Sequence, residues 1–282
     1  MTDGGFGMDG KIGKPIDEEI VEHYDSYDES SRLTGGFGLF ELERTKELIA
    51  RYLPESPSVV LDVGGASGVY SFWLAGLGHS VHLIDIVPRH IEQARQASLL
   101  PDSPQLAGMA VGDARELDLT DDFVDVVISH GPLYHLPERT DRLQTLKEAG
   151  RVLKPGGTLL AFAIGRYAGV IYGLTKGYVF DPDYLRMIGV EIAKGVRNDP
   201  PSWLKTFPSA FFHHPQELQE EIVEAGLIHE RTLGILGPAW LVPDLDLRWQ
   251  DAEKREALME VARLLENEPV LGPRLMAVAR KG

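Results

Sequence analysis

Between residues 59 and 164 the sequence alternates short apolar runs with longer amphipathic stretches, and this alternation constrains the fold more than any other feature. Each apolar run is short and ends in glycine or polar residues, as strands buried in a parallel sheet do. The predicted strands are Val59–Val63, Val81–Asp85, Met109–Val111, Phe123–Ser129 and Thr158–Ile164. The predicted helices between them are Val69–Leu77, Pro88–Leu99 and Glu138–Leu153. This order predicts an α/β fold with a doubly wound, mostly parallel sheet.

The flanking residues extend this sheet. Apolar residues recur at helical spacing from Leu39 to Tyr52, and Pro54 should end that helix. Beyond the core we expect helix Pro215–Ala225, strand Leu227–Leu236, helix Asp251–Leu265 and strand Leu275–Ala279, which makes a seven-stranded sheet. The expected organisation is a flexible tail with an N-terminal lid helix (1–34), a core (35–164), a cap insertion after strand five (165–213) and a C-terminal part of the sheet (214–282).

Charge and composition exclude several classes of protein. The 282 residues carry 28 basic and 43 acidic side chains, a net charge of −15, and the basic residues are scattered, so nucleic-acid binding is not expected. The absence of cysteine excludes disulfides, cysteine-ligated metals and cysteine nucleophiles. No apolar run is long enough for a membrane span, and the first ten residues do not resemble a secretory signal. We therefore expect a cytoplasmic protein without membrane contact.

The insertion after the fifth predicted strand is rich in aromatic residues. It holds nine of the 23 in the chain: Tyr167, Tyr172, Tyr178, Phe180, Tyr184, Trp203, Phe207, Phe211 and Phe212. A segment in this position lies over the carboxyl ends of the strands, where open α/β sheets bind ligands. The rings form either the wall of a pocket for a small organic molecule or the insertion's own core.

A glycine-rich turn follows the first predicted strand. Residues 62–69 read Asp-Val-Gly-Gly-Ala-Ser-Gly-Val, and such a turn lets a ligand approach the backbone. Asp85 closes the next strand, where a carboxylate can accept hydrogen bonds from ribose hydroxyls or cap a helix. The dinucleotide pattern G-x-G-x-x-G/A does not fit, whether it starts at Gly64 or at Gly65. The pattern D-x-G-x-[GA]-x-G does fit, with Asp62, Gly64, Ala66 and Gly68.

Together these motifs resemble those of class I S-adenosylmethionine-dependent methyltransferases. The resemblance covers residues 40–165 and passes through five blocks in the family's order, at residues 59–68, 84–85, 112–114, 125–127 and 153–157. The run Gly131-Pro132-Leu133-Tyr134-His135-Leu136 is further similar to a group of bacterial small-molecule methyltransferases. The resemblance implies S-adenosyl-L-methionine as cofactor, S-adenosyl-L-homocysteine as product, and a small-molecule methyl acceptor at oxygen or, second, nitrogen.

The resemblance also implies which residues hold the cofactor. Asp62 would orient the glycine turn, and the cofactor would lie along Gly64, Gly65, Ala66 and Gly68, although the family more often has glycine at position 66. Asp85 would hold the ribose, with Ile86 against the adenine, and Asp113 with the Ala114 backbone would read the adenine edge beside Gly112. Ser129 and His130 would offer backbone carbonyls to the methionine ammonium. An N-terminal lid would contribute Tyr24, Tyr27 and Arg32.

Two histidines are candidate catalytic residues. Methyl transfer needs a general base only when the acceptor must lose a proton. His135, and after it His130, follow the fourth predicted strand, beside which this fold places the methyl group. An ordinary histidine pKa near 6.5 would make His135 a base at neutral pH, although both side chains could equally pack as structural residues. No metal-ligand spacing is present, so we expect no catalytic metal.

The acceptor itself cannot be read from the sequence. The candidate acceptor-binding residues are Tyr134, Arg166, Tyr167, Tyr172, Phe212 and His213. The first alternative function is an S-adenosylmethionine-binding regulator without transfer activity, which would share every cofactor motif. The register of the glycine turn disfavours an NAD-dependent oxidoreductase. The lack of paired acids after strand four disfavours an enzyme that transfers the aminopropyl arm of S-adenosylmethionine instead of its methyl group. Monomer and homodimer both stay open.

Overall fold

The computed structural model describes residues 15–26, 35–54, 57–198, 200–207 and 209–282. Its sheet contains β1 (Val59–Val63), β2 (Ser80–Asp85), β3 (Gly108–Val111), β4 (Val124–Ser129), β5 (Leu153–Gly165), β6 (Val196–Arg197), β7 (Ala210–His213), β8 (Ile228–Gly234) and β9 (Arg274–Arg280). The strands lie in the order β3-β2-β1-β4-β5-β7-β6, and β9 pairs with both β5 and β8. Strands β1 to β5 are parallel, whereas β9 runs antiparallel to β5.

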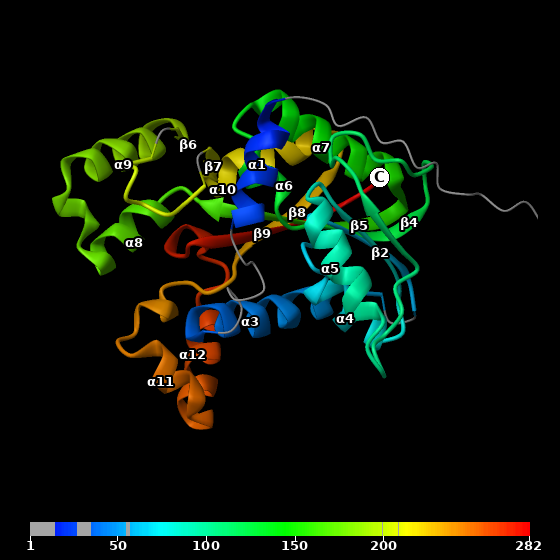
Figure 1. Cartoon of the computed structure of the whole chain (residues 1–282), viewed down its shortest axis with the longest axis horizontal. Helices are drawn as coiled ribbons and strands as arrows, with labels where there is room; N and C mark the ends of the chain where they lie inside the picture. Colours follow the sequence, from blue (N-terminus) through cyan, green and yellow to red (C-terminus); the bar gives the residue numbers. More distant parts are fainter. Residues whose placement is uncertain (1–14, 27–34, 55–56, 199, 208) are drawn as a thin grey trace, which may run out of the picture.

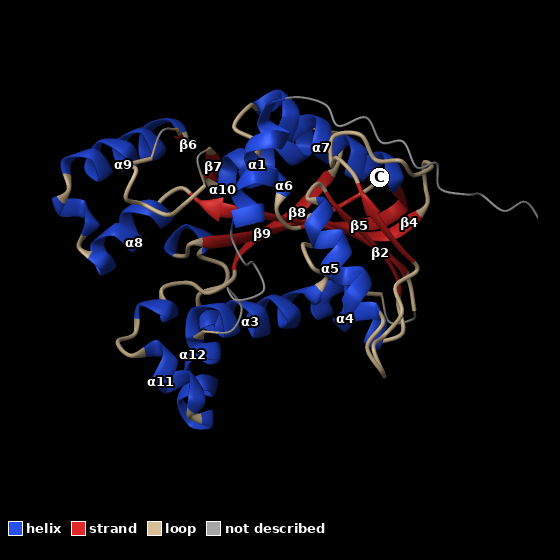
Figure 2. Ribbon diagram, in the orientation of Figure 1, coloured by secondary structure: helices blue, strands red, loops and turns tan. Residues whose placement is uncertain are grey.

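Helices cover both faces of this sheet (Figures 1 and 2). They are α1 (Pro15–Ser26), α3 (Gly36–Tyr52), α4 (Val69–Gly76), α5 (Pro88–Ser98), α6 (Pro132–His135), α7 (Arg139–Val152), α8 (Ala168–Lys176), α9 (Pro182–Lys194), α10 (Pro215–Glu224), α11 (Leu245–Gln250) and α12 (Ala252–Leu264). Side chains alternate across a strand. Val60 therefore packs in one core with α3, α4 and α12, and Leu61 packs in a second core with α7 and α10.

The predicted fold class is confirmed. The helices and strands expected between residues 39 and 164 are present, with ends that differ by a few residues, and so are the last two strands. The described sheet has nine strands where the sequence predicted seven, because two short strands, β6 and β7, lie inside the segment assigned to the cap. Ile164 and Gly165 of β5 pair with Phe212 and His213 of β7, so the end of that segment extends the sheet.

Two excursions leave the sheet at the same place. The cap, containing α8 and α9, begins where β5 ends at Gly165. The second excursion, containing α11 and α12, returns to the sheet at Arg274 of β9, which pairs with Ile164 of β5. Both project to the left in Figure 1, one above the other. Among the described helices, none has the length and apolar character needed to cross a membrane.

Candidate functional site

A pocket lies at the carboxyl ends of the parallel strands, and we call it the strand-end pocket. It is lined by residues of the turns that follow β1, β2, β3 and β4, together with Ile20 and Tyr24 of α1. Its empty space, mouth included, is about 980 Å³. Four turns meet there because the strands that precede them are parallel neighbours and so end at one edge of the sheet.

The turn after β1 bends through left-handed backbone at three positions. Gly64 has φ +75° and Gly68 φ +87°, which glycine adopts without strain, and Ala66 has φ +49° despite its Cβ. A Cβ on Gly64 would lie 2.8 Å from the His130 carbonyl oxygen. Glycine is therefore required at position 64, because the turns after β1 and β4 pack directly against each other.

Asp85 ties the ends of β1 and β2 together. Its Oδ2 accepts from the Ala66 N–H at 2.8 Å, and its Oδ1 accepts from the Val87 N–H at 2.9 Å. The Oδ1 also lies 3.1 Å from His90 Nδ1, which must carry the proton if a carboxylate is to accept this bond. The sequence predicted Asp85 as a ligand-binding residue, but it gave no indication of His90, five positions later on α5, which also lines the pocket.

The turn after β3 is fixed by an arginine that sequence reasoning missed. Arg115 donates from Nε and Nη2 to the Asp113 carboxylate at 2.6–3.0 Å, and its Nη1 reaches Asp141 at 3.1 Å. Arg115 is buried and lines the strand-end pocket beside Gly112 and Ala114. Its position directly after the Gly-Asp-Ala motif is the signal that could have identified it.

Three predicted cofactor residues do not line the strand-end pocket: Asp62, Gly68 and Ser129. Asp62 is fully buried behind the turn, where Ser71 Oγ donates to its Oδ2 at 2.6 Å. Its Oδ1 has no hydrogen-bond partner among the described residues, and burial raises the pKa of this carboxyl to about 6. Asp62 therefore supports the glycine turn from behind.

The remaining predicted cofactor residues either lie on the pocket wall or fall outside the residues that the structure describes. Gly64, Gly65, Ala66, Asp85, Ile86, Gly112, Asp113, Ala114, His130 and Tyr24 line the strand-end pocket. Tyr27 and Arg32 fall outside the described residues. Tyr24 places α1 over the pocket, because its ring contacts those of His90 at 5.0 Å and Phe207 at 5.8 Å between centroids.

The two histidines after β4 both line the pocket and are both buried. The His130 ring stacks on Phe162 at 4.3 Å. His135 Nε2 lies 3.0 Å from the Tyr24 hydroxyl, and burial, with a smaller contribution from nearby positive charge, lowers the pKa of His135 to about 3. The ordinary histidine pKa expected from the sequence is therefore wrong, because the site removes water from the imidazole. No cluster of three metal-ligating side chains occurs among the described residues.

A larger cavity opens between the two excursions, and we call it the cap cavity. It holds about 2570 Å³ of empty space, mouth included. Its walls are the cap, the start of α3 and the second excursion near residues 240–246. Phe207 lines it and contacts His135 of the strand-end pocket at a centroid distance of 4.5 Å. The two spaces therefore meet at Phe207 and His135.

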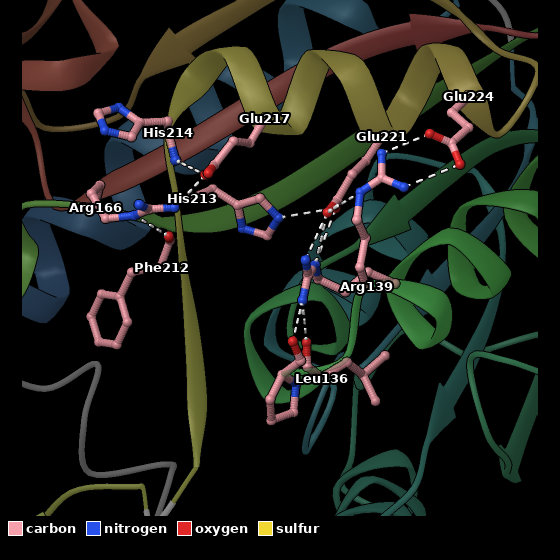
Figure 3. Close-up of polar contacts among 11 residues, drawn as sticks. Leu136, Arg139, Arg166, Phe212, His213, His214, Glu217, Glu221 and Glu224 are labelled. Atoms are coloured by element: carbon pink, nitrogen blue, oxygen red, sulfur yellow. Dashed lines mark hydrogen bonds and ion pairs between the residues drawn. The ribbon is translucent and has the colours of Figure 1, made fainter. Parts of the chain in front are cut away.

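The predicted acceptor-binding residues divide into three groups. Tyr134 lines the strand-end pocket, and Tyr172 and Phe212 line the cap cavity. Arg166, Tyr167 and His213 line neither. Arg166 is buried, donates to the Phe212 carbonyl at 2.7 Å and pairs with Glu217 (Figure 3). His213 is fully buried, with Nε2 3.2 Å from Glu221. These two side chains therefore hold β7 on α10.

Glu221 is the centre of a buried ion network behind both spaces. Arg142 on α7 pairs with Glu221 at 2.7 Å and donates to the carbonyls of Leu136 at 2.9 Å and Pro137 at 2.6 Å. Burial pushes the pKa of Glu221 up, but hydrogen bonds from His213 and Arg142 outweigh it and leave this pKa below its usual range. The network joins the turn after α6 to β7.

Comparison with known proteins gives a matching domain model and the fold. Residues 61–161 match a family model described as a methyltransferase domain. Among solved structures, the chain is similar to an S-adenosylmethionine-dependent methyltransferase from Methanosarcina mazei, with a TM-score of 0.58 and 24% identity, covering 83% of this chain and 96% of that one. The fold is that of class I methyltransferases, and S-adenosylmethionine is the cofactor of this class.

Two curated relatives show how far the similarity extends. The ubiquinone/menaquinone biosynthesis C-methyltransferase UbiE of Acidiphilium cryptum (strain JF-5) is 35% identical over 123 residues, 43% of this chain and 48% of that protein. The 27-O-demethylrifamycin SV methyltransferase of Amycolatopsis mediterranei (strain S699) is 26% identical over 294 residues, 95% of this chain and 98% of that protein. Three other curated relatives match more strongly than the rifamycin methyltransferase, but the chain spans only 48% to 66% of their length.

The strand-end pocket offers two features that a nucleoside ligand can use. A carboxylate offers about four lone-pair sites, and Asp85 uses three of them on protein N–H groups, so it can still accept from a hydroxyl in the pocket that it lines. Gly64 and Gly65 leave bare backbone at the wall, which a ligand can approach closely.

Proposed function

We propose that this protein is an S-adenosylmethionine-dependent methyltransferase that methylates a hydroxyl oxygen of a bulky small molecule. The observation that carries this proposal is the junction of the two spaces. The strand-end pocket has the walls for the cofactor, and the cap cavity meets it at His135 and Phe207. A donor in the pocket and an acceptor in the cavity would lie on either side of the His135–Phe207 contact, and displacement at carbon would require these two rings to separate.

In this proposal Asp85 accepts a hydrogen bond from a ribose hydroxyl of the cofactor, and the Ile86 side chain and Ala114 flank the adenine. Asp113, held by Arg115, also lines the pocket. The bound cofactor supplies an electrophilic methyl group on a positively charged sulfur. Ile20 and Tyr24 of α1 would help to exclude water from the pocket, which favours a reaction whose charge disperses in the transition state.

The environment of His135 indicates the chemistry of the acceptor. With its pKa lowered to about 3, His135 is neutral and accepts a hydrogen bond, but it does not retain a proton at neutral pH. An acceptor whose own hydroxyl is acidic, such as a phenol or an enol, needs no strong base. His135 would orient that hydroxyl, and the proton would leave to the water of the cap cavity, which is open to solvent.

The relatives support oxygen as the methylated atom without deciding it. The relative that matches along nearly its whole length is by name a methyltransferase of 27-O-demethylrifamycin SV, whereas UbiE, which matches over less than half of this chain, is by name a C-methyltransferase. The size of the cap cavity supports a bulky acceptor.

The proposal is tested by binding and transfer measured separately. We expect S-adenosylhomocysteine to bind in calorimetry, and labelled S-adenosylmethionine to lose its methyl group to a member of a panel of phenols and enols of increasing size. Tight cofactor binding with no transfer to any member would favour the non-catalytic regulator. Absence of cofactor binding, in a protein shown to be folded, would contradict the proposal.

A further inference from the structure

Arg274 presents an accessible charge to the cap cavity. It is the first residue of β9, it lines the cavity, and its side chain is 23% exposed. A guanidinium carries five N–H donors, and among the described residues only the Nε of Arg274 has a hydrogen-bond partner, Glu41 Oε1 at 3.2 Å. Its Nη1 and Nη2 are not among the buried atoms that lack a partner, so a ligand in the cavity can reach both.

The counter-charge of Arg274 lies behind the cavity wall. Glu41 of α3 is only 1% exposed and does not line the cavity. It meets Arg274 through Nε and leaves the two terminal nitrogens to the cavity side. Hydrogen bonds from a guanidinium to an ionised oxygen are about twice as strong as those between neutral groups. Arg274 can therefore hold an anionic oxygen without losing its bond to Glu41.

Cations outnumber anions on the wall of the cap cavity. Among the described residues, the charged ones that line it are Lys176, Arg197, Lys205, Arg274, Asp244 and Asp246. Asp246 already accepts from the Gly36 N–H at 2.5 Å, and Glu191, the partner of Arg197, does not line the cavity. The chain as a whole has a net charge of −15, so this wall departs from the average of the molecule. A wall of this sign attracts an anion.

Strand pairing places Arg274 beside the junction of the two spaces. Arg274 lies directly opposite Ile164 of β5 in an antiparallel pair, and residues so placed project to the same face of a sheet. Ile164 packs in one apolar cluster with Tyr134 and Phe207. Phe207 in turn contacts His135. Arg274 therefore lies on the face, and at the strand end, where an acceptor would meet the cofactor.

The charge of Arg274 reaches His135. Burial is the main cause that lowers the pKa of His135 to about 3, and the charges of His23 and Arg274 act in the same direction. A neutral imidazole cannot balance the charge of an ionised oxygen. Arg274 can, because it carries a positive charge and has donors to spare.

We propose that Arg274 binds the methyl acceptor as an anion, with its terminal nitrogens on the ionised oxygen of a phenol or enol. The O–H bond of the acceptor breaks, the proton goes to the water of the cap cavity, and the electron pair stays on the oxygen. This inference rests on the proposed function, because it assigns the cap cavity to the methyl acceptor.

The same charge restricts the class of acceptor. A neighbouring opposite charge lowers the pKa of an acid by about 1–3 units. This is enough to bring a phenol, whose pKa is near about 10, toward neutrality, but it leaves an aliphatic alcohol protonated. Arg274 therefore selects acidic hydroxyls and excludes ordinary alcohols.

An absorbance titration of a bound phenol tests the proposal. The probe is 7-hydroxycoumarin, whose phenol and phenolate forms absorb at different wavelengths, added to the full chain saturated with S-adenosylhomocysteine. We expect the acid dissociation constant of the bound hydroxyl to be at least about tenfold higher than that of the free probe. An unchanged or lower constant, or no binding of the probe at neutral to alkaline pH, would overturn the proposal.

Two variants assign the effect to Arg274. Arg274→Met combined with Glu41→Gln removes both charges together, so no buried charge is left without a partner. In this double variant the acid dissociation constant should return to within about threefold of the free probe. Glu41→Gln alone removes only the counter-charge, so it should raise the constant at least about threefold above the wild-type value. A wild-type constant in the double variant would contradict the proposal.

Two controls separate this role from a structural one. The ligand 7-methoxycoumarin has no proton to lose, so its affinity should be the same in the wild type and the double variant. Lys176→Met removes a positive charge from the same cavity wall, at the far end of α8, and should leave the acid dissociation constant of the hydroxycoumarin unchanged. An equal loss of affinity for both coumarins, or an equal effect of Lys176→Met, would show that Arg274 only shapes or charges the cavity, which overturns the proposal.

This proposal and the proposed function fail in different ways. Ionisation of the probe needs no methyl transfer, so a protein that binds the phenolate through Arg274 but methylates no member of the panel would contradict only the proposed function. Methyl transfer with no change in the bound hydroxyl between the wild type and the double variant would contradict only the role of Arg274. Binding of S-adenosylhomocysteine shows in the same experiment that each variant is folded.

Discussion

The strand-end pocket and the cap cavity are built in opposite ways. Apart from α1, the walls of the pocket come from turns that directly follow four adjacent parallel strands, so the sheet itself brings them together. The cap cavity is assembled from chain segments near residues 36, 170, 205, 243 and 274, which meet only after the two excursions have packed. The position of the pocket therefore follows from the sheet, whereas the shape of the cavity depends on tertiary contacts.

One buried ion pair connects the two regions, and breaking it should have the largest effect on stability. The Arg142–Glu221 pair joins the turn after α6, which borders the pocket, to β7, which borders the cavity. We expect Glu221→Ala to lower the free energy of unfolding by about 3–5 kcal/mol, because it leaves the buried Arg142 without a counter-charge. Urea denaturation measures this change.

The control for this prediction lies one turn further along α10. Glu224 is exposed and pairs with the exposed Arg139 (Figure 3), so Glu224→Ala should leave the urea midpoint almost unchanged. If both variants lost the same stability, the buried network would not be what joins the two regions.

A second variant should separate the regions by damaging only the pocket. Asp85→Ala removes the acceptor that holds the turn after β1 and, in our proposal, the ribose. We expect the binding free energy of S-adenosylhomocysteine to weaken by about 1.5–3 kcal/mol, the range for hydrogen bonds to a charged group. Affinity for a phenol of the acceptor panel should stay unchanged, since the cap cavity does not include Asp85. The exposed Glu92 on α5 provides the control, as Glu92→Ala should leave both affinities at the wild-type value.

The contrast between the regions also explains what the sequence could predict. The sheet, its order of elements and most of the pocket wall follow from short apolar runs and from the residue that ends each of them, which are local patterns. Arg115 lies beside a motif and was missed because an arginine in a turn is usually solvated. His90 was missed because nothing in the sequence states that a helical histidine turns toward Asp85.

The cap cavity could not be predicted in the same way. The aromatic content of the cap indicated a pocket, but the opposite wall comes from residues 240–246, about 70 positions later, and no pattern pairs these segments. Arg166 was predicted to bind the acceptor because it could pair with an acidic group there, and His213 because it lies where the aromatic insertion returns to the core. Their burial against Glu217 and Glu221 depends on β7 joining the sheet, which the sequence did not indicate.

A third prediction concerns His135, at the junction of the two regions. Its folded pKa of about 3 lies below the unfolded value near 6.5, so below pH 6.5 the unfolded chain takes up a proton that the folded chain does not. Stability should therefore fall as the pH drops from about 6.5 toward 3, with His135 contributing about 2 kcal/mol of that loss by pH 5.

The variant His135→Gln keeps a polar group beside Tyr24 and removes the titration. Urea denaturation at pH 7 and pH 5 should show a smaller loss of stability in this variant than in the wild type. His213, whose pKa is also lowered by burial, remains in both proteins and contributes equally. An unchanged loss in the variant would mean that water reaches His135 in the folded protein, which would contradict the burial that lowers its pKa.

The smallest expected effect tests whether strain in the pocket serves the ligand. Ala66 holds a left-handed backbone at φ +49° that glycine adopts without strain, so Ala66→Gly should raise the free energy of unfolding by up to about 1 kcal/mol. The opposite kind of substitution at the other end of the bend, Gly64→Ala, should be destabilising, because the new Cβ would meet the His130 carbonyl oxygen. If Ala66→Gly left stability unchanged and lowered the affinity for S-adenosylhomocysteine, the Ala66 methyl group would be part of the binding surface. The pocket, like the cavity, would then depend on side chains and not on the backbone of its turns alone.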